Sequence, residues 1–307
     1  MKVREAVLAG SWYEGSSAGC ARAIARLTQG YQPPQDLARV YGGVVPHAGW
    51  VYSGATAGKV LAAIRAVTEP EVFVLFGTHA QGIRPAAVDT HDAWDTPLGP
   101  VPVDDELRQA LLEQAAGALT ASSAPLRPGE NSLEIQMPLV RSLFPAAKIL
   151  PIGVYRAPSA ADVAQIRAVS DTAIAAGRAA AAAVQKLGRR AVFIASSDLT
   201  HYGANYDDNS HGPLPEALPW MKGNDRRVIT LIERLDAAAL VPEIAQHRNA
   251  CGEGALAAGT AAAAAAGATA ARLLEYTTSM EVTGERWAGS AVGYAGMVFY
   301  APGAGPQ

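Results

Sequence analysis

Short apolar runs rich in β-branched residues alternate with longer helical patterns along most of this chain of 307 residues. Runs of this kind predict buried strands, and the patterns between them predict helices. The clearest strands are expected at 39–46, 71–78, 148–155, 190–197 and 291–300, and weaker ones at 86–90 and 271–278. The alternation is typical of an α/β fold in which helices flank a mostly parallel central sheet.

The helical patterns show no internal repeat and no Ser/Gly-rich linker between them, which favours a single domain over residues 1–307. Residues 300–307 are expected to form a frayed tail. Residues 203–224 contain three prolines and predict a long loop, and loops of this length often cover a binding site. The expected helices are 17–28, 54–67, 104–116, 132–143, 160–187, 223–234, 236–247 and 253–266.

The composition narrows the classes of partner. A formal charge of −3 provides no basic surface for nucleic acid or anionic membranes, so a small molecule or a protein is the expected partner. Two cysteines cannot form a disulfide framework, and the first residues lack the apolar core of a signal peptide. We therefore expect a cytoplasmic protein that does not span a membrane.

Polar residues follow three of the predicted strands at the point where each strand ends. His47 follows the first strand, His79 follows the second, and Asp198 and His201 follow the strand at 190–197. Open α/β sheets bind ligands at the carboxyl ends of their strands, so these side chains are expected to meet. The alternative is that the histidines are ordinary loop residues and that Asp198 caps the next turn.

Two imidazoles and one further ligand would form an open metal site, and two histidines with a carboxylate suit non-haem Fe(II). Cys251 precedes a predicted helix, whose N-terminus favours a thiolate, although a buried cysteine is often inert. From the residues alone the third ligand stays open among Asp198, Glu130, Glu134, Cys251 and Glu253.

The segment 129–140, "GENSLEIQMPLV", predicts the start of a helix capped by Asn131 or Ser132. Glu130 and Glu134 could serve only as capping residues, or they could orient a metal-binding histidine. The motifs G-x-S-x-G and GxxxxGK[ST] and the dinucleotide fingerprint are absent, while a Ser-His-Asp triad, being defined by geometry, stays open.

Six motifs occur together over nearly the whole chain: "REAVLAGSWYEG", "VVPHAGWVYSG", "FGTHAQG", "ENSLEIQMPLV", "SSDLTHYG" and "NACGEGAL". In this order they resemble the Memo family, also known as the AmmeMemoRadiSam system protein B group. That family is similar in fold to the class III extradiol, LigB-like dioxygenases, which use non-haem Fe(II) and O₂ to open catechol rings.

The resemblance implies that His47 and His79 are metal ligands and that Cys251 stands where the dioxygenases have a carboxylate ligand. It also implies that Asp198 and His201 line the pocket, with His201 near the place of the dioxygenase acid/base histidine. We expect His201 to move a proton and Asp198 to orient it. Fe(II) is the expected metal, copper the alternative and zinc the third choice. Further residues expected in or behind the pocket are Tyr13, Trp50, Tyr52, Glu130, Asn131, Glu134 and Tyr202, some of which could simply pack in the core.

One departure concerns Asn131, because the family often has histidine at this position and an amide cannot relay a proton. The loop 203–224, with its own His211, could also reshape the pocket. The leading hypothesis is a metal-dependent, oxygenase-like enzyme that acts with O₂ on a small substrate, aromatic or otherwise. The alternative is a protein without catalytic activity that binds a metal, takes part in redox reactions or binds a ligand. A zinc or serine hydrolase is a third and weaker hypothesis. Ser196 and Ser197 are interpreted as structural caps.

Overall fold

The computed structural model describes residues 1–78, 84–122, 129–285 and 288–303 of the chain. Its main sheet has the strand order β10-β12-β2-β9-β3-β8-β4-β7, and β11 pairs with β12 beside this path. The four central strands are mutually parallel: β2 (Leu37–Val45), β9 (Ala191–Ser196), β3 (Val72–Gly77) and β8 (Lys148–Gly153). This parallel centre confirms the α/β fold.

Antiparallel strands flank the parallel centre and make the whole sheet mixed. On one side β12 (Ser290–Pro302) runs antiparallel to β2, β11 (Ala270–Thr278) and the short β10 (His201–Gly203). On the other side β4 (Ala86–Asp89) is antiparallel to β8 and parallel to β7 (Leu119–Ser122). A separate small sheet consists of β1 (Val3–Arg4), β5 (Ala93–Trp94) and β6 (Val101–Pro102).

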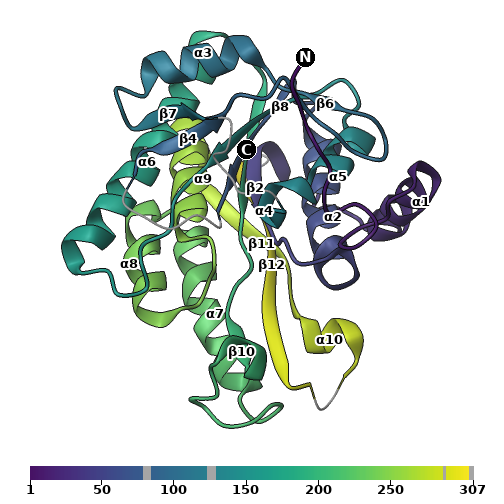
Figure 1. Cartoon of the computed structure of the whole chain (residues 1–307), viewed down its shortest axis with the longest axis vertical. Helices are drawn as coiled ribbons and strands as arrows, with labels where there is room; N and C mark the ends of the chain where they lie inside the picture. The colour runs from purple at the N-terminus through teal and green to yellow at the C-terminus, as the bar shows by residue number, and fades with distance from the viewer. Residues whose placement is uncertain (79–83, 123–128, 286–287, 304–307) are drawn as a thin grey trace.

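Helices cover both faces of the sheet (Figure 1). On one face α9 (Glu253–Ala266) lies against β9, β2 and β3, and α6 (Val163–Lys186) and α8 (Ala237–His247) pack on α9. On the other face α2 (Trp50–Val67) lies against β2 and β12, and α1 (Ser17–Thr28) packs on α2. The remaining long helices are α3 (Asp105–Gln114), which packs on α6, and α7 (Leu218–Glu233), which packs on α8.

Some boundaries differ from the expected ones. The helix expected at 132–143 is divided into α4 (Asn131–Glu134) and α5 (Met137–Leu143). Pro138 explains the break, because a proline ring clashes with the carbonyl four residues earlier and provides no N–H. Strand β12 continues through Pro302, into the segment expected to be frayed, and α7 begins within the expected loop 203–224.

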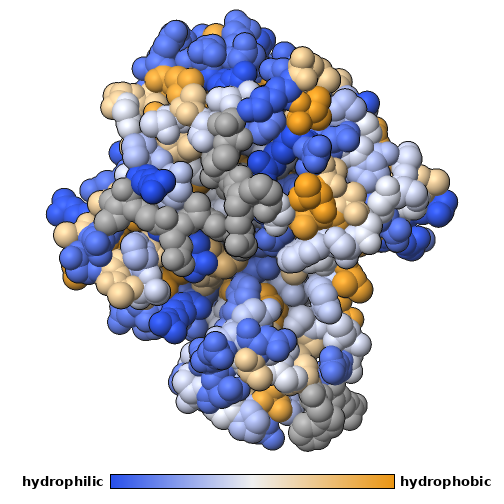
Figure 2. Space-filling model, in the orientation of Figure 1, coloured by the Kyte–Doolittle hydropathy of each residue, from blue (hydrophilic) through white to orange (hydrophobic). Residues whose placement is uncertain are grey.

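A lower lobe extends from the main body at the bottom of Figure 1. It contains β10, η1 (Ala204–Tyr206), α10 (Ser279–Thr283), the start of β12 and the start of α7. A small core of its own holds it together, made of Tyr202, Leu214, Ala217, Met221, Met280 and Ala291. On the face seen in Figure 2, the hydrophobic residues of the described ranges are scattered among hydrophilic ones and form no large apolar surface.

The described residues include no helix that combines the length and the hydropathy needed to span a bilayer.

The contact between α6 and α9 depends on a residue without a side chain. A Cβ atom added to Gly177 would lie 2.1 Å from the Ala258 carbonyl oxygen, which belongs to the backbone of α9. The two helices could keep this close contact only with glycine at position 177.

Gly177→Ala should therefore lower the free energy of unfolding by about 1–3 kcal/mol, the usual result of overpacking. Helix propensity alone predicts a gain of about 1 kcal/mol. Gly223→Ala is the matched control, because Gly223 lies in α7 and nothing lies within 4 Å of its added Cβ. That variant should gain stability in urea unfolding, and equal effects of the two substitutions would contradict the packing account.

Asp225 of α7 connects the lower lobe to the main sheet through hydrogen bonds. Its fully buried carboxyl accepts hydrogen bonds from the Thr200 backbone N–H at 2.8 Å and from the Tyr276 hydroxyl at 2.7 Å. Burial raises the pKa of Asp225 to about 6, although both hydrogen bonds oppose the shift.

The folded protein should therefore hold the Asp225 proton to a higher pH than the unfolded chain does. Wild-type stability then falls relative to Asp225→Asn as the pH rises from about 4 to about 6, by up to about 3 kcal/mol. Urea unfolding of both proteins at several pH values measures the difference. A difference that does not change with pH would show that Asp225 titrates normally.

Candidate functional site

The carboxyl ends of β2 and β9 bring His47 and Asp198 together. Val45 pairs with Ser196 in the parallel register, so the segments that follow these residues leave the sheet side by side. The His47 backbone N–H donates to Asp198 Oδ1 at 2.6 Å. The expected meeting of these two residues at one edge of the sheet is therefore confirmed.

The His47 ring lies between two side chains from other elements. Its Nδ1 is 2.9 Å from Ser196 Oγ, and its Nε2 is 3.1 Å from Cys251 Sγ. The His47 carbonyl accepts a hydrogen bond from Asn131 Nδ2 at 2.8 Å. Asn131 therefore holds the backbone of His47, a role that needs an amide donor and no proton transfer.

Cys251 lies between α8 and α9, and its N–H donates to the Asp198 carbonyl at 3.2 Å. Burial, together with the nearby negative charge of Asp198, raises the pKa of the Cys251 thiol to about 12. Burial therefore opposes the stabilisation of a thiolate that is expected from the helix N-terminus. A bound cation beside the sulfur would be needed to hold it as a thiolate at neutral pH.

Asp198 and His201 are close in sequence but have different partners. The Asp198 carboxyl accepts the backbone N–H groups of His47 and Ala48, while burial raises its pKa to about 7. His201 Nδ1 donates to the Leu199 carbonyl at 2.9 Å, and burial lowers the pKa of its ring. We expected Asp198 to orient His201, but the partner that orients this ring is the Leu199 carbonyl.

Two of the three expected metal ligands, His47 and Cys251, are in contact, and the third, His79, lies outside the described residues. Within the described ranges no group of three or more His, Cys, Asp or Glu side chains is arranged to hold a metal ion. The imidazole nitrogen and the sulfur nevertheless face each other at 3.1 Å, which fits two ligands of one soft or borderline metal.

A cleft of about 1420 Å³ opens in front of His47, Asp198, His201 and Asn131. Tyr13, Trp50 and Tyr52 line it, as expected from the sequence. Three further aromatic residues that we did not expect from the sequence also line it: Trp12, Tyr206 and Tyr294. Trp12 and Tyr206 are 39% and 42% exposed, and the Tyr206 ring packs edge-on against His201 with centroids 4.8 Å apart.

Trp12 belongs to the same "GSWY" stretch as Tyr13, which could have indicated it. The position of Tyr206 depends on the path of the loop after His201, and no periodic pattern marks that path. Tyr294 lies in β12, which is distant in sequence from the rest of the site.

Two expected pocket residues have structural roles away from the cleft. Tyr202 is fully buried in the lower lobe, where its hydroxyl donates to the Gly212 carbonyl at 2.6 Å and accepts the His211 N–H at 2.9 Å. Glu130 is fully buried and caps α4, and burial raises its pKa to about 7. The sequence did not reveal that these two side chains point away from the cleft.

Glu134 and Glu253 hold backbone segments around the site in place. Among the described residues, their hydrogen bonds and ion pairs go to Leu8, Tyr13, Ala157 and Arg156, and not to the proposed metal ligands. Glu134 Oε1 accepts the Leu8 N–H at 2.7 Å and the Tyr13 hydroxyl at 3.2 Å, so it anchors the N-terminal wall of the cleft. Glu253 accepts the Ala157 N–H at 3.0 Å and pairs with Arg156, with 3.3 Å between Nε and Oε2. Burial raises the pKa of both carboxyls.

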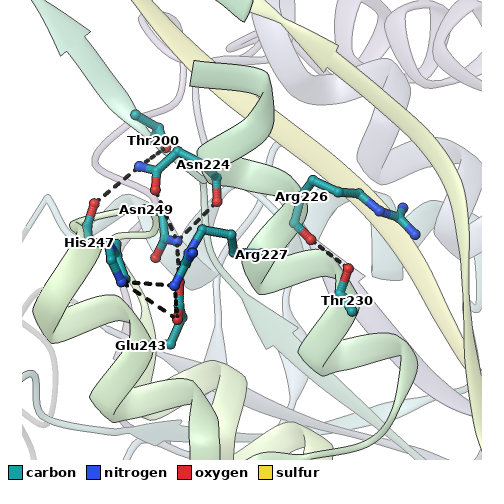
Figure 3. A network of polar contacts seen from close by, with 8 residues as sticks. All are labelled: Thr200, Asn224, Arg226, Arg227, Thr230, Glu243, His247 and Asn249. Carbon is teal, nitrogen blue, oxygen red and sulfur yellow. Dashed lines mark hydrogen bonds and ion pairs between the residues drawn. The ribbon is translucent and has the colours of Figure 1, made fainter. Parts of the chain in front are cut away.

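A polar network lies behind the loop that carries Cys251 (Figure 3). The fully buried Asn249 donates from Nδ2 to the Asn224 carbonyl and to Glu243 Oε1, each at 3.0 Å. Glu243 also pairs with Arg227, and Asn224 Nδ2 donates to Thr200 Oγ1 at 3.2 Å. The network thus connects the Cys251 loop to α7, to α8 and to the segment between Asp198 and His201.

Asn249→Ala should lower the free energy of unfolding by about 1–3 kcal/mol, because it removes two hydrogen bonds of a fully buried amide, to the Asn224 carbonyl and to Glu243. The looser loop should also speed the reaction of Cys251 with a thiol reagent, measured in a Cys20→Ala background. Thr230→Ala is the matched control. It removes an exposed hydrogen bond in the same region and should change stability by less than about 0.5 kcal/mol. Equal labelling rates in the two variants would contradict a supporting role for Asn249.

Comparison with known proteins gives one consistent result. The sequence model of the family described as "Memo-like protein" matches residues 4–298. A MEMO1 family protein of Pyrococcus furiosus is 34% identical, over 96% of this chain and 98% of its own length. MEMO1 family proteins of Methanosarcina acetivorans and Pyrobaculum aerophilum are each 32% identical, over 97% and 98% of this chain and 99% and 100% of their own lengths. The chain therefore belongs to the Memo family.

Proposed function

We propose that this protein binds a redox-active metal at His47 and Cys251 and acts as an oxygenase-like enzyme on a small aromatic substrate. The observation that carries the proposal is the 3.1 Å contact between His47 Nε2 and Cys251 Sγ at the carboxyl end of the sheet. His47 lines the cleft together with Asp198, and the Cys251 N–H donates to the Asp198 carbonyl. His79, one residue after Thr78, would supply a third ligand.

The donor set suits Fe(II) or copper, with zinc as the third choice. A bound Fe(II) with open coordination positions would supply the chemistry that activates O₂ toward an electron-rich ring. A thiolate in place of a carboxylate would give the metal a softer ligand than the dioxygenases use, so the ring-opening reaction itself is not a necessary outcome.

His201 would handle the substrate proton. Its Nδ1–H is engaged by the Leu199 carbonyl, which leaves the lone pair of the neutral ring on Nε2. Burial lowers the pKa of His201, so the ring is an acceptor at neutral pH. A phenolic hydroxyl in the cleft could transfer its proton to this nitrogen and receive it back at a later step.

The aromatic residues of the cleft would hold a flat substrate by stacking. Trp12, Tyr52 and Tyr206 are partly exposed and line the same cleft as His201. The cleft volume exceeds the range of about 300–1,000 Å³ that is usual for small ligands. We therefore expect a small substrate to occupy only the inner part.

The alternative proposal is a metal or ligand-binding protein without turnover. The ligand set favours it in one respect, because the resemblance implies that Cys251 stands where the dioxygenases have a carboxylate. Copper bound by a thiolate and imidazoles could then serve a redox or storage role. Oxygen consumption separates the two proposals.

Metal content is the first test of the site. Wild-type protein purified without a tag or chelator should contain about one metal ion per chain, and His47→Ala and Cys251→Ser should each lose most of it. His211→Ala and Cys20→Ala are matched controls, because His211 stacks on Trp220 in the lower lobe and Cys20 lies in α1. Full metal content in both site variants would show that the site is assigned wrongly.

Oxygen uptake is the test of catalysis. Protein loaded with Fe(II) without air should consume O₂ when phenolic substrates are added, measured with an oxygen electrode. His201→Ala should keep its metal but lose about 10²–10⁴-fold in turnover. If no metal and no phenolic substrate supports uptake, the binding protein becomes the better account.

A further inference from the structure

The contact between His47 and Cys251 is part of a closed ring of residues that are linked by hydrogen bonds. His47 Nδ1 meets Ser196 Oγ at 2.9 Å, and Ser196 Oγ donates to the Ser132 carbonyl. Ser132 Oγ accepts the Thr78 N–H at 2.9 Å, and Thr78 Oγ1 donates to the Cys251 carbonyl at 3.3 Å. The contact between Cys251 Sγ and His47 Nε2 closes the ring.

The donors and acceptors available at Ser196 decide the direction of its hydrogen bonds. A carbonyl oxygen can only accept, so the single hydroxyl proton of Ser196 points to the Ser132 carbonyl. Ser196 Oγ can then only accept from the His47 ring. Ser196 and Ser132 are both fully buried, so water does not offer either group another partner.

We propose that Ser196 is a positioning residue that fixes His47 in the tautomer protonated at Nδ1, with the Nε2 lone pair directed toward Cys251. From the sequence alone we expected this serine to be a structural cap. Its hydroxyl instead determines which nitrogen of His47 faces the sulfur.

Contacts of the His47 backbone and the position of Ser196 in the sheet keep the imidazole in this orientation. The His47 backbone is held at both ends, with its N–H on Asp198 and its carbonyl on Asn131, so the ring rotates only about its own side-chain bonds. Ser196 is the last residue of β9, and the parallel register fixes it beside Val45, two residues before His47. A flip of the ring would break the contacts at both nitrogens.

The neighbouring serine provides a control within the same strand end. Ser197 Oγ donates to the Asp198 carbonyl at 2.7 Å, accepts the Gly252 N–H at 3.0 Å and lies 3.9 Å from Cys251 Sγ. Successive side chains of an extended strand point to opposite sides. Ser196 therefore serves His47, and Ser197 serves the Cys251 loop.

The consequence for metal affinity rests on the proposed metal site, whereas the tautomer is a property of the metal-free protein. A histidine ligand that loses the partner of its other nitrogen commonly loses about 10–100-fold in metal affinity. Ser196→Ala should do so, and Ser196→Thr, which keeps the hydroxyl, should retain most of the affinity.

The test is nitrogen-15 NMR of metal-free protein labelled at histidine, with the His47 signals assigned by comparison with His47→Ala. Wild type, Ser196→Thr and Ser197→Ala should show His47 protonated at Nδ1. Ser196→Ala should show a mixture of tautomers or the Nε2-protonated form.

Protonation of His47 at Nε2 in the wild type would overturn the inference without the need for any variant. An unchanged tautomer in Ser196→Ala would overturn it as well. If the wild type shows the expected tautomer and the switch occurs in Ser196→Ala, but the protein binds no metal, this inference stands and the proposed metal function fails.

Discussion

The parallel pairing of β2 with β9 fixes where the site can form. Gly42 of β2 has a φ of +139°, and a Cβ atom there would lie 1.9 Å from the Phe193 carbonyl oxygen of β9. Glycine therefore lets the two backbones approach in a register that a side chain would prevent. Because this register carries through to Val45 and Ser196, the residues that follow meet at one edge of the sheet. The site thus depends on a backbone contact about five residues earlier in β2.

Around this edge of the sheet, hydrogen bonds that involve backbone groups hold several residues of the site in place. Asp198 holds the His47 and Ala48 N–H groups, Asn131 holds the His47 carbonyl, and the Leu199 carbonyl holds His201. Such contacts require only a carboxylate, an amide or a carbonyl in the right place. They explain how Asn131, whose amide cannot relay a proton, can still hold the backbone of His47.

The sequence predicted the central strands and most long helices, because their hydrophobic periodicity is strong and local. It also predicted that His47 and Asp198 would meet, since both follow strands of a parallel sheet. It did not predict the contacts of Ser196, the buried positions of Tyr202 and Glu130, or the arrival of Tyr206 in the cleft. These features depend on which way a side chain points at a strand end and on the path of an irregular loop, and neither leaves a periodic trace in the sequence.

X-ray absorption spectroscopy of the protein loaded anaerobically with Fe(II) tests the central claim most directly, because it reports the atoms bound to the metal. The account predicts one sulfur ligand together with nitrogen or oxygen ligands in the wild type, loss of the sulfur in Cys251→Ser, and its retention in Cys20→Ala. A metal bound without sulfur in the wild type, or a spectrum unchanged in Cys251→Ser, would contradict it.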